Sequence, residues 1–271
     1  MNKKFYTLGL AGILSSISLT AIADDTIDTI GFDEETPTCV SDITLPDGVE
    51  FTRIFPDCGY TEGFAPVKKD GKYGFVNQSG KLIIDAQYQE THAFSDGLAL
   101  VKKDGKYGFI DKTGKSVIAP KYTDAWGFWE GRAKIAQNGK YGFIDKTGKV
   151  VINPIYDEVG DWFEDGLVVV KTGGKYGFID KAGKMLIKPQ FDLAKDFSEG
   201  RAVVANKTGK TNAEGRPLYR YGFIDKSGKV VIEMRYDLAE DFVKGAAFVI
   251  DGQQIYFIDK DGKPTQMPDY Y

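Results

Sequence analysis

The sequence contains one histidine and two cysteines among 271 residues, so few side chains are available as metal ligands or catalytic nucleophiles. Tryptophan is also scarce, with three residues beside 18 phenylalanines and 15 tyrosines. Neither sign of charge dominates, and the slight excess of acid (39 acidic against 35 basic residues) argues against a nucleic-acid partner. Beyond residue 23, apolar runs fall short of the roughly 20 residues that cross a bilayer. We therefore expect a folded domain without a membrane span.

The first 23 residues have the three parts of a secretory signal peptide. Lys3 and Lys4 precede a mostly apolar stretch at 5–20, and residues 21–23 form an A-x-A cleavage pattern. The apolar stretch is short for a membrane anchor. We expect export to the periplasm or the extracellular space, with an acidic N-terminal arm at 24–48 and a single domain at 49–271.

Export would place the two cysteines in an oxidising compartment. Cys39 and Cys58 precede the regular part of the sequence, and we expect them to form a disulfide that holds the N-terminal edge. A redox or metal role is the alternative, but the chain has no C-x-x-C pattern and no histidine near either cysteine. The sequence predicts no metal site and no cofactor.

A tripeptide, Tyr-Gly-Phe, recurs along the chain. It stands at 73–75, 107–109, 141–143, 176–178 and 221–223, with a degenerate copy at 255–257. A second landmark, which we call the corner glycine, follows an acidic or polar residue at 63, 97, 131, 166, 200 and 245. Most copies are 34 or 35 residues apart, and the single step of 45 residues indicates an insertion within 205–220.

One unit, residues 97–130, shows the expected local structure. Strand-forming runs at 98–101, 107–111 and 117–122 are separated by turn signals, and no stretch has a helical period. The sequence therefore predicts an all-β fold of about six three-stranded antiparallel meander units. The units must stack, either in an open twisted array or in a closed propeller-like ring. Degenerate units at both ends, with 49–63 as a worn third strand and corner, favour the open array.

These units resemble WG repeats, which are bacterial β-rich repeats with the pattern G-K-W-G-[YF]-I-[DN]-x-x-G-K-x-V-I-x-P-x-[YF]-[DE]. Residues 139–157, GKYGFIDKTGKVVINPIYD, match it with tyrosine in place of the tryptophan. The resemblance covers roughly residues 60–271. Because the family has no general catalytic motif, the resemblance implies a binding or scaffold role and transfers no active site.

Three repeated columns have a simple structural explanation. The phenylalanine three residues before each corner glycine is expected in the core. The turn aspartate is expected to bond its own backbone rather than bind calcium. The lysine after it is expected to protect an edge, with attraction of a polyanion as the alternative. These columns are Phe94, Phe128, Phe163, Phe197 and Phe242; Asp111, Asp145, Asp180, Asp225 and Asp259; and Lys112, Lys146, Lys181, Lys226 and Lys260.

The three tryptophans, in contrast, occupy positions that the repeat does not require. Trp126, Trp129 and Trp162 lie five, two and four residues before their corner glycines, where other units carry mostly polar residues. His92 and Asp161 occupy the Trp126 position in the preceding and following units. We expect these five residues to form an exposed patch that suits a sugar face, a peptide side chain or a partner protein. In the alternative, the tryptophans fold over the corners and fill them.

The sequence thus favours an exported, non-catalytic binding or scaffold protein whose partner is an envelope protein or glycan. A glycan hydrolase is one alternative, and Glu130 and Asp161 are the candidate carboxylate pair. A purely structural surface component is the other, and it predicts no binding that depends on tryptophan.

Overall fold

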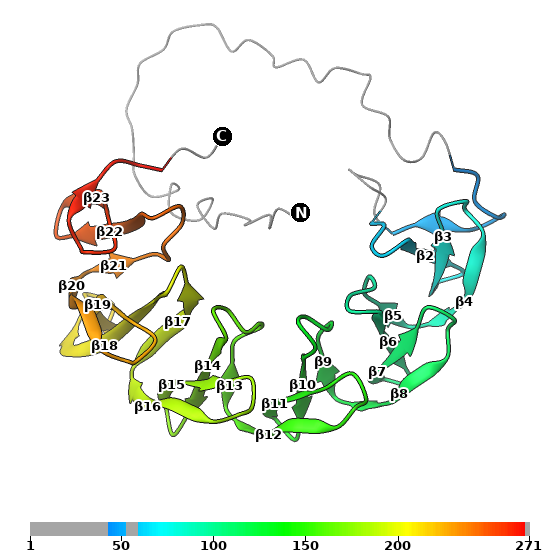
Figure 1. Ribbon diagram of the computed structural model, residues 1–271, viewed down its shortest axis with the longest axis horizontal. Coiled ribbons are helices and arrows are strands. Elements are labelled where there is room, and N and C mark those ends of the chain that lie inside the picture. The colour runs from blue at the N-terminus through cyan, green and yellow to red at the C-terminus, as the bar shows by residue number, and fades with distance from the viewer. Residues whose placement is uncertain (1–42, 53–58, 269–271) are drawn as a thin grey trace, which may run out of the picture. The chain divides into compact units, whose positions relative to one another are not determined.

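The computed structural model describes residues 43–52 and 59–268, where the chain forms strands, turns and bends. Six antiparallel sheets follow one another along the chain, each with four strands in meander order (Figure 1). The predicted all-β array of six meander units is therefore confirmed. Within the described ranges, no helix is long and apolar enough to cross a membrane. The predicted signal peptide, most of the predicted arm, and Cys39 and Cys58 lie outside the described residues.

In the first three sheets, one short strand precedes three longer ones. The first sheet contains β1 (Glu50–Phe51), β2 (Phe64–Lys69), β3 (Lys72–Asn77) and β4 (Leu82–Tyr88). The second contains β5 (Glu90–Thr91), β6 (Leu98–Lys103), β7 (Lys106–Asp111) and β8 (Ser116–Tyr122). The third contains β9 (Asp124–Ala125), β10 (Ala133–Gln137), β11 (Lys140–Ile144) and β12 (Val150–Tyr156).

The last three sheets keep this order with changes in strand length. The fourth contains β13 (Glu158–Val159), β14 (Leu167–Thr172), β15 (Lys175–Asp180) and β16 (Met185–Phe191). The fifth contains β17 (Leu193–Ser198), β18 (Arg201–Thr211), β19 (Pro217–Ile224) and β20 (Val230–Tyr236). The sixth contains β21 (Leu238–Ala239), β22 (Ala247–Asp251), β23 (Gln254–Ile258) and β24 (Pro264–Thr265).

Each unit has the three predicted strands and one additional strand at its edge, which is two residues long in every described unit except the fifth. In the second sheet this strand is β5, where Glu90 pairs with Lys102 and Thr91 with Val101. Strand β5 comes from the polar stretch before the corner. It pairs with backbone groups of β6 that would otherwise be unpaired at the edge of the sheet. The first unit follows the same plan, because residues 50–51 form β1 beside β2 rather than the expected third strand.

The glycine of Tyr-Gly-Phe is required by a close approach of two strands. A Cβ on Gly142 would lie 2.3 Å from the carbonyl oxygen of Ile152. The register shifts at this point, so that β12 bulges against the glycine. Pro154 lies within the bulge, where its missing N–H interrupts no ladder bond. The corresponding glycines are as tightly enclosed by backbone, and they are Gly74, Gly108, Gly177 and Gly222.

The core lies between successive sheets. The Phe109 ring of the second unit packs on Phe128 of the next corner with a centroid distance of 4.8 Å, and both side chains are buried. The same contact joins Phe75 to Phe94, Phe143 to Phe163, Phe178 to Phe197 and Phe223 to Phe242. The predicted core phenylalanines are therefore confirmed. Because each unit covers the apolar face of the one before it, the units stack in chain order.

The turn aspartates have the structural role that the sequence predicted. The Asp111 carboxylate accepts hydrogen bonds from the backbone N–H groups of Thr113 (2.9 Å) and Lys115 (3.0 Å). The four later turn aspartates make equivalent bonds, and Asn77 does so in the first unit. Within residues 43–52 and 59–268, no group of three or more His, Cys, Asp or Glu side chains is arranged to hold a metal ion.

Candidate functional site: exposed tryptophans at successive corners

Each corner ends in a tight two-residue turn that displays the residue before it. At the third corner, Glu130 (φ 48°) and Gly131 (φ 77°) both have positive φ, as in a type I′ turn. Trp129 and Arg132 flank this turn and exchange backbone hydrogen bonds of 2.8 and 3.1 Å. These bonds therefore fix the backbone at Trp129, from which its side chain extends.

Neighbouring corners are tied together by polar contacts that recur along the chain. The Asp96 carboxylate accepts a hydrogen bond from the backbone N–H of Gly131 (2.6 Å), and Lys146 donates to the Asp96 carbonyl (3.1 Å). Equivalent contacts join Glu62 to Gly97 and Lys112, Asp165 to Gly200 and Lys226, and Glu199 to Gly245 and Lys260. The repeated lysines thus contact corners of preceding units, a role that their repeat position in the sequence did not indicate.

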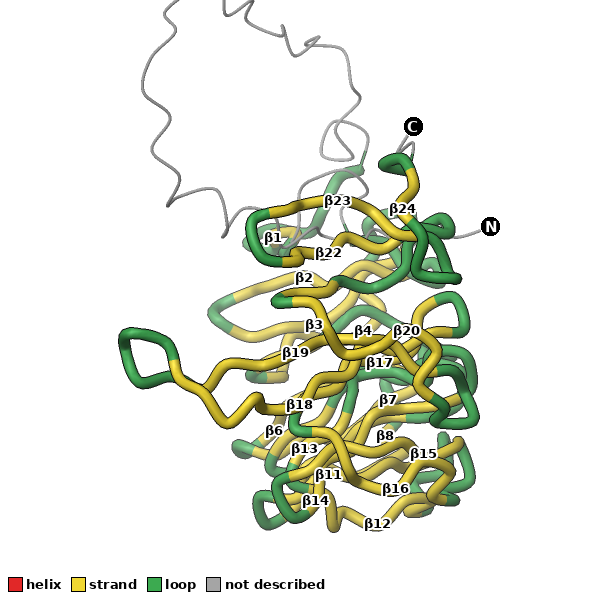
Figure 2. Tube along the Cα trace, turned by 90° about the vertical axis from the view of Figure 1, so that its left-hand side faces the viewer, coloured by secondary structure: helices red, strands yellow, loops and turns green. Residues whose placement is uncertain are grey.

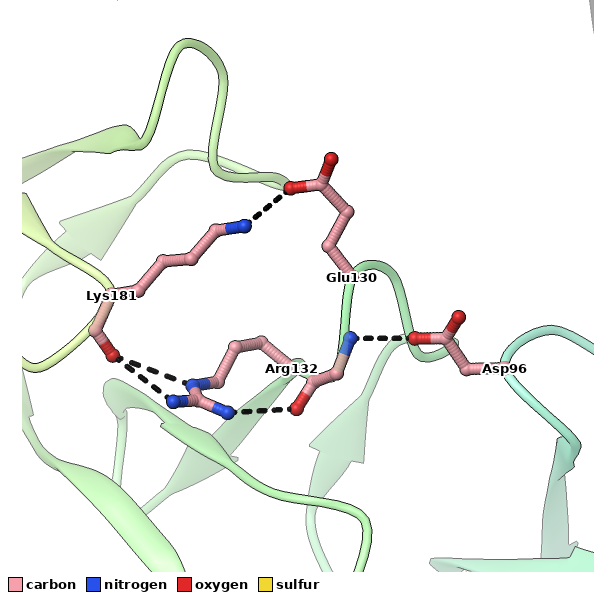
Figure 3. A network of polar contacts seen from close by, with 5 residues as sticks. Asp96, Glu130, Arg132 and Lys181 are labelled. Atoms are coloured by element: carbon pink, nitrogen blue, oxygen red, sulfur yellow. Dashed lines mark hydrogen bonds and ion pairs between the residues drawn. The ribbon is translucent and has the colours of Figure 1, made fainter.

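Around the third corner this network is larger. Lys181 pairs with the Glu130 carboxylate, and the Arg132 guanidinium donates to the backbone carbonyls of Lys181 (3.4 Å) and Gly131 (3.0 Å) (Figure 3). Asp96 reaches the same turn from the second unit. Contacts from two neighbouring units therefore fix the corner that carries Trp129.

Trp129 and Trp162 lie together at the surface. Their ring centroids are 6.1 Å apart with an interplanar angle of 63°, which is an edge-to-face arrangement. Each residue is 40% exposed. The two residues come from successive corners, so the structure brings together two of the tryptophans that the sequence placed in one patch.

Trp126 has a different environment and is half-buried. Its ring covers the ammonium group of Lys134 at 4.0 Å and lies 6.0 Å from the Tyr141 ring. The Lys134 ammonium also contacts the Asp161 carboxylate at 2.6 Å and the carbonyl of Val159 at 3.4 Å. Trp126 thus packs over a buried cation, which agrees for this residue with the alternative that tryptophans fill a corner.

The other two predicted site residues, His92 and Asp161, are not part of the exposed Trp129–Trp162 pair. His92 is exposed on the corner of the second unit, and the ring contacts described above do not involve it. Asp161 stands next to Trp162 in the sequence but pairs with Lys134. The expected patch of five residues is therefore an exposed pair of tryptophans beside a cluster of Trp126, Lys134 and Asp161.

Sequence reasoning missed Lys134, although a signal was present. Lys134 is 7% exposed and occupies a position that is apolar in the other units. The equivalent residues are Pro66, Leu100, Val169, Val203 and Phe248. A lysine in an otherwise apolar column indicates a local partner for its charge, and that partner is Asp161.

Asp196 is a second residue that the sequence did not single out. Burial raises its pKa to about 7, and the negative charges of Asp161, Glu164 and Asp241 act in the same direction. The backbone N–H of Val169 donates to its carboxylate at 2.8 Å, which partly opposes this rise. Burial raises the pKa of Asp241 as well. The polar residues Asp196 and Asp241, which occupy the repeat position of Trp162, are therefore partly buried rather than fully exposed.

The two candidate carboxylates of a hydrolase are held by different cations. Glu130 pairs with Lys181 in the fourth unit, and Asp161 pairs with the buried Lys134 of the third. Their side chains are 53% and 54% exposed. The described contacts therefore assign each carboxylate to a separate ion pair.

Comparison with known families agrees with this architecture. A profile of the WG containing repeat matches residues 52–73, 73–107, 107–141, 141–176, 176–210 and 221–252. These matches cover more than half of the sequence, and the chain belongs to the WG-repeat family. It is thus a repeat β protein whose surface recurs from unit to unit. A comparison with curated proteins gave no match.

Several solved structures are similar at low sequence identity. A eukaryotic initiation factor has 10% identity and a TM-score of 0.49, over 75% of this chain and 62% of that chain. Hsv2 of Kluyveromyces lactis has 10% identity and a TM-score of 0.40, over 78% and 76%. The WD40 domain of Neurospora crassa Pan2 has 14% identity and a TM-score of 0.35, over 76% and 74%.

Proposed function

We propose that this chain is an exported, non-catalytic binding or scaffold protein of the bacterial envelope. Trp129 and Trp162 form its contact surface, and its partner is an envelope protein or an envelope glycan. The observation that carries the proposal is the exposure of two adjoining indoles at positions that the repeat does not require. Clustered apolar surface of this kind is typical of interaction sites.

The chemistry of the pair suits both kinds of partner. An indole presents a flat apolar face and one N–H donor, so it can contact the apolar face of a sugar ring or a side chain of a protein. The network around Glu130, Arg132 and Lys181 fixes one of the two corners before binding. Such preorganisation lowers the conformational entropy that association costs.

A catalytic role finds less support. A glycosidase needs one protonated and one ionised carboxyl group on either side of the scissile bond, about 5–10 Å apart. Glu130 and Asp161 each have a lysine partner of their own. We therefore propose binding without a chemical step.

Export is tested separately: protein recovered from the periplasm or the medium should have a mature N-terminus at Asp24.

The binding experiment is co-sedimentation of the mature protein with purified cell-wall sacculi. The test variant combines Trp129→Ser and Trp162→Ala, because Ser95 and Ala93 occupy the same positions in the second unit. Trp126 is left unchanged, since its ring covers the Lys134 ammonium. A control variant combines Ile155→Gln and Leu186→Val, which reduces exposed apolar surface elsewhere and uses residues that occur at the same positions in other units.

Three outcomes separate the hypotheses. If the wild type and the control sediment and the tryptophan variant does not, the partner is a glycan bound by the pair. If none sediments, the cell-wall glycan is excluded as the partner, and a photocrosslinking residue at position 162 should attach to one envelope protein. If the tryptophan variant sediments like the wild type, the pair is not the wall-binding surface and the proposal is wrong.

A further inference from the structure

The insertion in the fifth unit forms a long hairpin that no other unit has. Strands β18 and β19 continue past their sheet, and Figure 2 shows this hairpin extending beyond the neighbouring strands. Asn206 pairs with Arg220, Lys207 with Tyr219, and Thr211 with Pro217. We call residues 206–220 the extension. Every residue of it from Lys207 to Leu218 is exposed.

The extension is strongly basic within an acidic chain. Its 15 residues include four basic side chains and one acid, Glu214, whereas the whole chain has a net charge of −4. The basic residues are Lys207, Lys210, Arg216 and Arg220. Arg220 forms an ion pair with Asp237 at the base, and the ion pair described for the Arg216 guanidinium is with Glu214 of the extension itself. Among the described ion pairs, none involves Lys207 or Lys210, so most of this positive charge is not neutralised by the body of the protein.

The extension also offers backbone and apolar groups. Strand β17 pairs with β18 as far as Ala205, and β20 pairs with β19 from Tyr221 onward. The Lys207 N–H donates to the Asp192 carboxylate near the base of the hairpin. Further along, neither outer edge of the hairpin is paired with another of the described strands. Leu218 is 42% exposed, and the Tyr219 ring lies 6.4 Å from Tyr221.

We propose that the extension is a docking surface for an extended acidic segment of a partner protein. A free strand edge can accept such a segment as an additional strand, with main-chain hydrogen bonds. Lys207, Lys210 and Arg216 would attract its carboxylates and accelerate the encounter. Leu218 and Tyr219 would contact its apolar side chains. This surface is separate from the Trp129–Trp162 pair, so either proposal can fail alone.

Two variants test the extension without disturbing the sheet. In the first, Asp-Gly replaces residues 207–219, which reproduces the turn that joins Lys103 to Lys106 in the second unit. In the second, Lys207→Gln, Lys210→Gln and Arg216→Gln remove charge and keep the hairpin. The control combines Lys115→Gln, Lys149→Gln and Lys184→Gln, which removes three exposed lysines from the turns. Circular dichroism confirms that each variant is folded.

The probes are fluorescent poly-L-glutamate, polyphosphate and phosphatidylglycerol vesicles, each measured in low and physiological salt. The proposal predicts that poly-L-glutamate binds the wild type and the control equally. It predicts about tenfold weaker binding by the charge variant and no detectable binding by the shortened variant.

An equal loss of binding in the control would reveal general attraction to lysine and overturn the proposal. Equal binding of polyphosphate would show that charge alone determines binding, and preferential binding of vesicles would assign the surface to a membrane; either result would overturn the proposal. The proposal is also overturned if the wild-type protein does not bind poly-L-glutamate.

Discussion

The ammonium group of Lys134 lies 2.6 Å from the carboxylate of Asp161, although the two residues belong to different units. Lys134 is buried, whereas the Asp161 side chain is 54% exposed. The pair joins the third unit to the corner that carries Trp162. The geometry therefore links a buried charge in a strand to the position of one exposed indole.

Replacing Asp161 with alanine should destabilise the protein by about 1–2 kcal/mol, because a buried ammonium group loses its anionic partner. This cost lies in the lower part of the usual range for losing the partner of a charged group, because the Asp161 carboxylate is accessible to solvent. Lys134→Leu, which installs the residue of the second unit, should change the free energy of unfolding by less, because it removes the buried charge itself. Urea unfolding followed by tryptophan fluorescence measures both effects.

A double variant separates the pair from its surroundings. In the Lys134→Leu background, Asp161→Ala should cost less than about 0.5 kcal/mol, as expected for an exposed side chain. An equal cost in both backgrounds would show that Asp161 acts independently of Lys134.

Asp196 should make stability fall as pH rises from about 4 to about 7. Its folded pKa of about 7 exceeds the ordinary value of 3.8, so the folded state binds the proton more tightly. This contribution is fully present below the unfolded pKa and is lost as pH rises through the folded pKa. A difference of about three pH units corresponds to as much as about 4 kcal/mol.

Asp196→Asn isolates this contribution, because the amide oxygen can still accept the Val169 N–H bond. The variant should match the wild type near pH 4 and exceed its stability at pH 8. Carboxylates with lowered pKa values, such as Glu158 and Glu199, remain in both proteins and cancel in the difference. A stability difference that stays constant between pH 4 and pH 8 contradicts the raised pKa of Asp196.

The repeated columns made the architecture predictable from the sequence. A phenylalanine or aspartate that recurs every 34 or 35 residues has the same environment in each unit, so one interpretation served all copies. The additional edge strand was missed because β5 and all of its equivalents except β17 are only two residues long, which is too short for a recognisable alternation. Such a strand is determined by the unpaired edge of its neighbour rather than by its own residues.

Residues that break the repeat were harder to place. The sequence correctly put Trp129 and Trp162 on adjoining corners, since their offsets from the corner glycine are fixed. It could not show that Trp126 turns onto Lys134, because that contact depends on one substitution in a neighbouring strand. Asp196 was missed for a similar reason. A Cβ on Gly160 would lie 2.3 Å from its carboxylate, so the glycine of another unit provides the space it fills.

The turn aspartate should be replaceable by asparagine but not by alanine. Asp111→Ala removes the acceptor for the N–H groups of Thr113 and Lys115 and should cost about 1 kcal/mol. Asp111→Asn should retain most of the stability, as Asn77 does in the first unit. The hydrogen bond from the Thr113 hydroxyl lowers the pKa of Asp111, so the carboxylate stabilises the fold above pH 4 and loses this effect in acid. Urea titrations at pH 7 and pH 3 measure both comparisons, and equal losses for the two variants would exclude the hydrogen-bonding explanation.

Gly142→Ala should be among the most destabilising single substitutions in the chain. Its Cβ would lie 2.3 Å from the Ile152 carbonyl oxygen and 2.7 Å from a backbone carbon of Asn153, so β12 must move. Overpacking of this kind costs about 3 kcal/mol or more when backbone must shift.

Gly127→Ala is the matched control, because a Cβ there meets nothing within 4 Å and Ala93 occupies the same position in the second unit. It should be neutral or stabilise slightly by restricting the unfolded chain. Thermal unfolding of the two variants distinguishes the cases, and similar midpoints would show that the bulge tolerates a methyl group and that the repeated glycine has another cause.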